Sequence, residues 1–245
     1  MRFARLQTSS GIRHAVAQDD LWAVIEDPFV DELIFTGDEV AFEDAKLLAP
    51  VEPKVLIGIA HNRNNNDHPL PIQAWHKSVR GIAGPGDAIQ RPSDVRIVNI
   101  EGELAVVIGK PAYRLTLENA FDAVFGYTIA NDVTNPDQNA VDEKSFQSKG
   151  GINYTPLGPW IETEVVDPES VGIEVFVNGK LEIQSGSFNL PSSVAATLVY
   201  VTSWVPLGPG DVILTGSPKT WAPVQSGDVV DIALAGLGTL TNPVE

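Results

Sequence analysis

The sequence has no cysteine among its 245 residues. This excludes a disulfide framework, a thiol nucleophile, a thiolate zinc site and an iron–sulfur cluster. Histidine is also scarce, with 4 residues in the whole chain. A metal site, if the protein has one, must therefore be built from oxygen or imidazole ligands.

Basic residues are few: the chain has 16 lysines and arginines but 32 aspartates and glutamates. Its formal net charge is therefore −16, and its isoelectric point is near 4.5. Such a charge repels phosphate backbones and anionic membranes, so we expect no nucleic-acid partner. The chain also lacks any run of about 18 apolar residues, and no apolar run follows its early arginines. We therefore expect a soluble, cytoplasmic protein with no membrane partner.

The remaining composition, 43% hydrophobic and 20% charged, is that of a globular protein. Residues 1–52 are predicted to form a small N-terminal domain, because short alternating runs are broken by turn residues and the segment ends in a linker with Pro50 and Pro53. Residues 53–245 are long enough to bury a sizeable core. We predict that they form the main domain.

From residue 55 onward, short runs rich in valine and isoleucine are separated by glycine and proline, which is typical of β-strands. Asn178-Gly179 predicts a two-residue hairpin. Glycine-aspartate pairs mark three turns that open a strand, at 86–87, 210–211 and 227–228. These local turns argue against a parallel βαβ arrangement.

Two segments have a convincing helical pattern. The first, residues 117–124, follows Thr116 as a cap and carries Leu117, Phe121 and Val124 on one face, and the second, residues 192–204, follows a proline. The fold class is therefore predicted to be mainly β (α+β), a β-rich roll or sandwich with few helices.

Glu101 and Glu103 lie two residues apart in a predicted strand, so both side chains leave the same face. Asp132 follows another apolar strand, residues 125–130, at a strand end where functional residues often collect. Each residue taken alone is also consistent with a solvated strand edge or a turn cap. Together, three carboxylates without cysteine or clustered histidine suit Mg²⁺ first, or Mn²⁺ or Ca²⁺, rather than Zn²⁺.

Five blocks, taken in this order, resemble signatures of the fumarylacetoacetate hydrolase family across about residues 53–245. They are E-G-E-L-A-V-V-I-G at 101–109, G-Y-T-I-A-N-D-V-T at 126–134, K-G-G-I-N-Y-T-P-L-G-P-W at 149–160, P-G-D-V-I-L-T-G-S-P at 209–218 and G-L-G-T-L-T-N-P-V at 236–244. The resemblance implies a mixed β-sandwich roll and a homodimer.

The resemblance also implies that Glu101, Glu103 and Asp132 bind one divalent cation. The family's substrates are 2-oxo acids and acylpyruvates, which chelate the metal through carboxylate and 2-oxo oxygens. Such a metal withdraws electrons from the 2-oxo group, so that a neighbouring carbon–carbon bond can break, a carboxyl group can leave, or a proton can move. One site can therefore support hydrolysis, decarboxylation or isomerisation.

Lys149 matches the family's catalytic lysine, whose ammonium would stabilise an oxyanion or enolate beside the metal. Thr215 and Gly216 lie in the family's T-G-x-P turn, where a hydroxyl and a glycine amide can bind a substrate carboxylate. Without the resemblance, these residues would be interpreted as a surface lysine and a turn.

The chain departs from the family in the N-Y-x-x-H-x-x-E lid of its hydrolytic and decarboxylating members. Asn66 stands in the place of the histidine and Pro69 in the place of the glutamate. His61 and His68 are the candidates to replace the catalytic histidine, with Asp67 as an orienting carboxylate for His68. A loop histidine that only caps or packs is the alternative interpretation.

A second departure follows Thr134, where Asn-Pro-Asp-Gln replaces a block in which the family often has a substrate-binding arginine. Arg80, Arg63 and Lys144 are alternatives for binding a substrate carboxylate, and the sequence does not choose among them. The substrate of any one family member therefore does not transfer to this chain.

The leading hypothesis is a Mg²⁺-dependent enzyme that hydrolyses a carbon–carbon bond in an acylpyruvate or 2-oxo dicarboxylate from aromatic-compound catabolism. The first alternative is isomerisation or decarboxylation on the same metal site, because a missing His-Glu pair removes the water-activating base most directly. The second alternative is a non-catalytic protein that binds a metal ion and a 2-oxo acid.

Overall fold

The computed structural model describes residues 1–60, 72–139, 141–142 and 144–245. Its strands are β1 (Arg2–Thr8), β2 (Gly11–Gln18), β3 (Leu21–Ile25), β4 (Phe35–Ala41), β5 (Lys46–Leu48), β6 (Leu56–Ala60), β7 (Gln73–His76), β8 (Ile82–Ala83), β9 (Val98–Ile108), β10 (Val124–Asn131), β11 (Thr155–Glu162), β12 (Gly172–Val177), β13 (Lys180–Gly186), β14 (Val212–Leu214), β15 (Trp221–Val224), β16 (Val229–Leu234) and β17 (Gly238–Pro243). Its helices are α1 (Pro136–Asn139), α2 (Val194–Trp204) and the 3₁₀ turns η1 (Phe42–Asp44), η2 (Val79–Gly81), η3 (Ala120–Ala123), η4 (Pro168–Ser170) and η5 (Ser187–Asn189). The prediction of a mainly β fold is confirmed.

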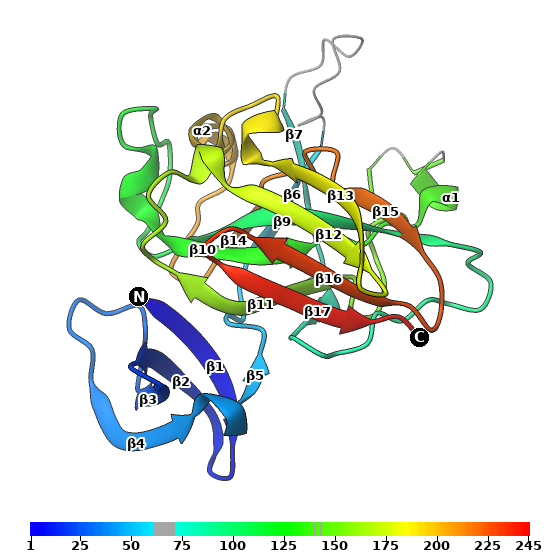
Figure 1. Cartoon of the computed structure of the whole chain (residues 1–245). Helices are drawn as coiled ribbons and strands as arrows, with labels where there is room; N and C mark the ends of the chain where they lie inside the picture. The colour runs from blue at the N-terminus through cyan, green and yellow to red at the C-terminus, as the bar shows by residue number, and fades with distance from the viewer. Residues whose placement is uncertain (61–71, 140, 143) are drawn as a thin grey trace.

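The larger sheet runs in the order β4-β3-β2-β1-β11-β10-β9-β14-β6-β7, with β15, β5 and β8 paired at its side. Most pairs are antiparallel, but β14 pairs with β6 and β8 with β11 in parallel, so the sheet is mixed. The N-terminal strands lie at one end of the molecule (Figure 1). They join the rest through β1, whose Arg2 and Phe3 pair with Glu162 and Ile161 of β11.

The smaller sheet, β13-β12-β16-β17, packs in front of β9, β10 and β11 in the view of Figure 1. Gly102 of β9 shows how close the two layers are, because a Cβ atom at this position would lie 3.0 Å from Ile232 Cγ2 and 3.1 Å from Val175 Cγ2. Ile100 and Leu104, on the same face of β9, are fully buried in the main core. This face of β9 is therefore committed to packing, and its odd-numbered residues face the opposite side.

Most of the predicted turns are present. Asn178 and Gly179, with φ angles of 53° and 75°, form the hairpin between β12 and β13. The glycine-aspartate pairs at 210–211 and 227–228 precede β14 and β16. The pair at 86–87 is followed only by an isolated bridge between Ile89 and Val244, so the prediction of a strand there is wrong.

The predicted helix at 192–204 is confirmed as α2, and the Oγ of Ser193 accepts the Ala196 N–H at 3.0 Å to cap it. The predicted helix at 117–124 is wrong, since only the 3₁₀ turn η3 forms there and Leu117 is 63% exposed. The Asn119 side chain accepts the Thr116 N–H at 2.7 Å and so closes a local turn in place of a helix. Within the described part of the chain, no helix is long and apolar enough to cross a membrane.

Candidate metal centre

Glu101 and Glu103 project from one face of β9, as the two-residue spacing predicts. The intervening Gly102 and the following Leu104 pack toward the smaller sheet, so the glutamates are directed to the other side. Glu103 is 1% exposed, and the Glu101 side chain is 13% exposed. The strand therefore holds one carboxylate inside the protein and one at its boundary.

Asp132 joins the glutamates because β10 is the antiparallel neighbour of β9. Asn131 pairs with Gly102, and the Asp132 N–H donates to the Glu101 carbonyl at 2.9 Å. One carboxylate oxygen from each of Glu101, Glu103 and Asp132 lies within 4.8 Å of the others. The predicted carboxylate triad is thus assembled in space, and Asp132, at 1% exposure, is as deeply buried as Glu103.

Neutral donors fix two of these carboxylates. The Thr134 hydroxyl donates to Glu101 Oε1 at 2.7 Å, and the Gly216 N–H donates to Glu103 Oε2 at 2.8 Å. The Thr215 hydroxyl donates to the Leu104 carbonyl at 2.8 Å. The turn at 215–216 therefore supports β9 directly, and its contact with a substrate carboxylate stays a prediction.

Two lysines bind opposite oxygens of Asp132. Lys149 Nζ lies 2.7 Å from Asp132 Oδ2 and 3.2 Å from Glu101 Oε2. Lys77, directly after β7, donates from Nζ to Asp132 Oδ1 and to the Tyr154 carbonyl. The side chains of Lys77 and Lys149 are only 1% and 8% exposed, so these ion pairs are shielded from water.

The carboxylates differ in pKa because their surroundings differ. Burial raises the pKa of Glu103 well above its ordinary value, and the neighbouring Asp132 and Glu101 raise it further. Burial also acts to raise the pKa of Asp132, but Lys149 and Lys77 outweigh it, so this pKa is lowered. Lys149 has a raised pKa because Asp132 and Glu101 outweigh the opposing effect of burial.

This arrangement fits a divalent cation. Three carboxylates face two lysines, which leaves the cluster one negative charge in excess when all groups are ionised. Among the described residues, no ammonium or guanidinium group lies within 4 Å of the Glu103 carboxylate. A cation shared by the triad would compensate this buried charge, and an all-carboxylate donor set is the type that Mg²⁺ and Ca²⁺ prefer. The residues present therefore fit the predicted metal ion.

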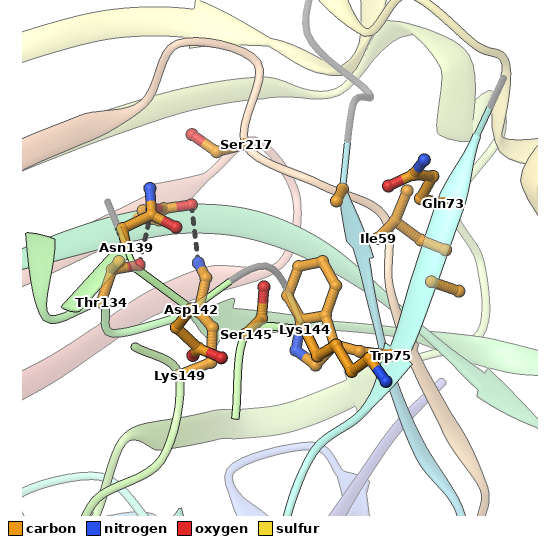
Figure 2. Close-up of a pocket in the computed structure, with 13 residues that line it drawn as sticks. Ile59, Gln73, Trp75, Thr134, Asn139, Asp142, Lys144, Ser145, Lys149 and Ser217 are labelled. Atoms are coloured by element: carbon orange, nitrogen blue, oxygen red, sulfur yellow. Dashed lines mark hydrogen bonds and ion pairs between the residues drawn. The ribbon is translucent and has the colours of Figure 1, made fainter. Parts of the chain in front are cut away.

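A cavity of about 530 Å³ opens beside the triad. The Thr134 hydroxyl and the Lys149 ammonium both contact the Glu101 carboxylate at the border of this cavity. Figure 2 shows Ser217 on the far side of the drawn pocket from Asp142 and Lys144, and Gln73 and Trp75 on β7. The Trp75 ring centroid lies 5.6 Å from Lys149 Nζ, within the range of a cation–π contact. The described residues that line the cavity are Ile59, Ala60, Gln73, Ala74, Trp75, Glu101, Thr134, Asn139, Asp142, Lys144, Ser145, Lys149 and Ser217.

The structure brings Lys149 and the three predicted metal ligands together. His61 and His68, the predicted lid histidines, lie outside the described residues. Lys77 was not predicted, and no feature of the segment Gln-Ala-Trp-His-Lys distinguishes it from a surface lysine after an edge strand. Only the pairing across the sheet shows that it contacts Asp132.

Comparisons with known proteins agree with this geometry. Residues 48–245 match the family model described as fumarylacetoacetate (FAA) hydrolase C-terminal, and residues 1–50 match the one described as Rv2993c-like, N-terminal. The oxaloacetate tautomerase YisK of Bacillus subtilis is 31% identical, over 83% of this chain and 74% of its own.

Two solved structures resemble the whole chain. That of 5-carboxymethyl-2-hydroxymuconate delta-isomerase from Mycobacterium smegmatis is 36% identical, with a TM-score of 0.93 over 100% of this chain and 99% of its own. That of the fumarylacetoacetate hydrolase from Exiguobacterium antarcticum is 29% identical, with a TM-score of 0.86 and the same coverage. The chain belongs to the fumarylacetoacetate hydrolase family, and its fold is the mixed β roll of that family with a small N-terminal domain.

Proposed function

We propose that the protein is a divalent-cation-dependent enzyme that interconverts tautomers or double-bond isomers of a 2-oxo acid through an enolate. The observation that carries this proposal is the triad of Glu101, Glu103 and Asp132 beside Lys149 at the end of one cavity. Mg²⁺ is the proposed ion, and when bound it would polarise the 2-oxo group and stabilise negative charge on its oxygen.

Lys149 supplies the second positive group. Because its pKa is raised, it remains an ammonium at neutral pH and acts as an electrostatic partner rather than as a base. Its contacts with Asp132 and Glu101 hold Nζ at the edge of the triad, where charge on a substrate oxygen would develop. The Trp75 ring lies beside this lysine, within the range of a cation–π contact that favours the charged ammonium.

Isomerisation is placed first because Asn66 and Pro69 stand where hydrolytic family members carry the histidine and glutamate of the lid. Hydrolysis needs a base that activates water, whereas tautomerisation needs no attacking water and only groups that carry a proton between two atoms of the substrate. The names of two relatives point in the same direction, one an oxaloacetate tautomerase and the other a delta-isomerase.

Hydrolysis of a carbon–carbon bond is the second candidate. It is supported by the resemblance to the Exiguobacterium antarcticum hydrolase over the whole chain. It would require a base outside the described lining, and His61 and His68 are the proposed residues for that role. Decarboxylation would use the same enolate, and a homodimer in the cytoplasm stays a prediction.

The proposal is tested by incubating the protein with oxaloacetate, an acylpyruvate and 2-hydroxyhepta-2,4-diene-1,7-dioate, in Mg²⁺ and in chelator, and reading the products by NMR. Chelator-sensitive keto–enol conversion or a shifted double bond supports the isomerase. Pyruvate with a free acid supports the hydrolase, and carbon dioxide supports the decarboxylase. If no substrate changes faster than with the Glu101→Gln variant, a binding role replaces the enzyme.

A further inference from the structure

The cavity beside the triad has one wall at the end of α1 and among the described residues that follow it. Asn139, Asp142, Lys144 and Ser145 line this wall. The sequence offers three basic residues for binding a substrate carboxylate: Arg80, Arg63 and Lys144. Of the two that the structure describes, Lys144 lines this cavity and Arg80 does not. Arg80 lines a different cavity together with Arg5 and Glu52, and Arg63 lies outside the described residues.

Lys144 differs from the other lysines of the site in its charge environment. Lys77 and Lys149 are both bound to Asp132. No carboxylate of the described residues lies within 4 Å of Lys144 Nζ. Asp142, the described acidic residue on the same wall, accepts the N–H groups of Gln147 and Ser148 at 2.6 and 2.8 Å. Lys144 is therefore available to an anion inside the cavity.

The rest of the wall suits a polar ligand. Gln73, Asn139, Ser145 and Ser217 offer amide and hydroxyl groups to the cavity, and the apolar residues of its described lining are Ile59, Ala60, Ala74 and Trp75. The chain carries a net charge of −16, so an anion entering the cavity needs local positive charge. A 2-oxo acid with one carboxylate would use its charge at the triad and leave Lys144 without a partner.

We propose that Lys144 binds the second carboxylate of a 2-oxo dicarboxylic acid and so selects dicarboxylates over monocarboxylates. This inference rests on the proposed function, in which the 2-oxo end of the same molecule lies at the triad beside Lys149. Lys144 is then a specificity-determining residue, since an ammonium–carboxylate contact adds affinity only for ligands with charge at both ends.

The test is a comparison of two ligands of nearly the same shape. In 2-oxobutyrate, a methyl group replaces the second carboxylate of oxaloacetate. Binding of each to the Mg²⁺-loaded protein is measured by calorimetry, with freshly prepared oxaloacetate, for the parent, Lys144→Met and Lys144→Arg. We expect Lys144→Met to weaken oxaloacetate binding about tenfold, leave 2-oxobutyrate unchanged, and be rescued by Lys144→Arg.

Lys110→Met is the matched control. This substitution changes the net charge by the same amount, and Lys110 is exposed and does not line the cavity. The proposal is overturned if Lys144→Met weakens both ligands alike or neither, or if Lys110→Met has the same effect. Binding is measured apart from turnover. Selective binding without conversion of oxaloacetate would therefore retain the Lys144 assignment and reject the isomerase.

Discussion

Lys77 and Lys149 donate to opposite oxygens of the Asp132 carboxylate, Lys77 to Oδ1 and Lys149 to Oδ2. The two lysines come from different segments, one after the edge strand β7 and the other from the loop before β11. All three side chains are buried, so each ammonium compensates charge that water cannot reach. Asp132 is thus held from both sides while one face of the triad borders the cavity.

Lys77→Met is expected to destabilise the protein by about 2–4 kcal/mol, because it removes one of two charges that compensate a buried aspartate. The Tyr154 carbonyl also loses its ammonium donor. Urea denaturation at neutral pH measures the effect. Lys180→Met, which breaks the exposed Lys180–Glu182 pair, is the control and should change stability by less than about 0.5 kcal/mol. Equal effects of the two substitutions would show that the Lys77 pairing is not structural.

Glu103→Gln is expected to stabilise the metal-free protein at high pH. The pKa of Glu103 is raised in the folded state, so the folded protein binds this proton more tightly than the unfolded chain does. The protonated Glu103 therefore contributes fully to the free energy of unfolding below pH 4.5, the ordinary pKa of a glutamate. This contribution is lost as the pH rises through the raised pKa of the folded state. Each tenfold difference in proton affinity between the folded and unfolded states corresponds to about 1.4 kcal/mol.

The measurement is thermal unfolding of the parent and Glu103→Gln in chelator from pH 4 to pH 8. The two curves should meet at the acid end and separate as the pH rises, with the variant more stable. Glu39→Gln, on the exposed face of β4, is the control. A parent that stays as stable as the variant at pH 8 would contradict the raised pKa.

Asp142→Ala is expected to reduce turnover through the position of Lys149. Asp142 Oδ2 accepts the Gln147 and Ser148 N–H groups and the Ser148 hydroxyl, and Ser148 immediately precedes Lys149. Losing this acceptor leaves the buried Ser148 N–H without a partner, which destabilises the turn before Lys149. Steady-state kinetics should show a larger fall in kcat than for Asp137→Ala, which alters an exposed aspartate on α1. An unchanged kcat would show that Asp142 lines the cavity but does not position Lys149.

Local rules were sufficient for much of the fold and for the ligands of the site. Strand alternation predicted that Glu101 and Glu103 share one face, and the position of Asp132 at a strand end marked it as a candidate third ligand. Asn178-Gly179 predicted the hairpin because both residues readily adopt positive φ angles. These features depend on residues that are close in sequence or on adjacent strands.

Long-range contacts were not predictable in the same way. Lys77 resembles any lysine after an edge strand until the order of the sheet brings it to Asp132. The pairing of β1 with β11 joins the N-terminal strands to the main sheet, and no sequence pattern near either strand predicts it. At residues 117–124 the apolar spacing suggested a helix, but the Asn119 side chain and the packing against α2 favoured a turn.

We expect Glu101, Glu103 and Asp132 together to bind one divalent cation. The most direct measurement is a titration of the protein with Mn²⁺, followed by electron paramagnetic resonance, for the parent, Asp132→Asn and the control Asp137→Asn. We expect one site per chain in the parent and the control, competition by Mg²⁺, and a loss of at least about tenfold in affinity in Asp132→Asn. Equal Mn²⁺ affinity in Asp132→Asn and the parent would show that the triad is not the cation site.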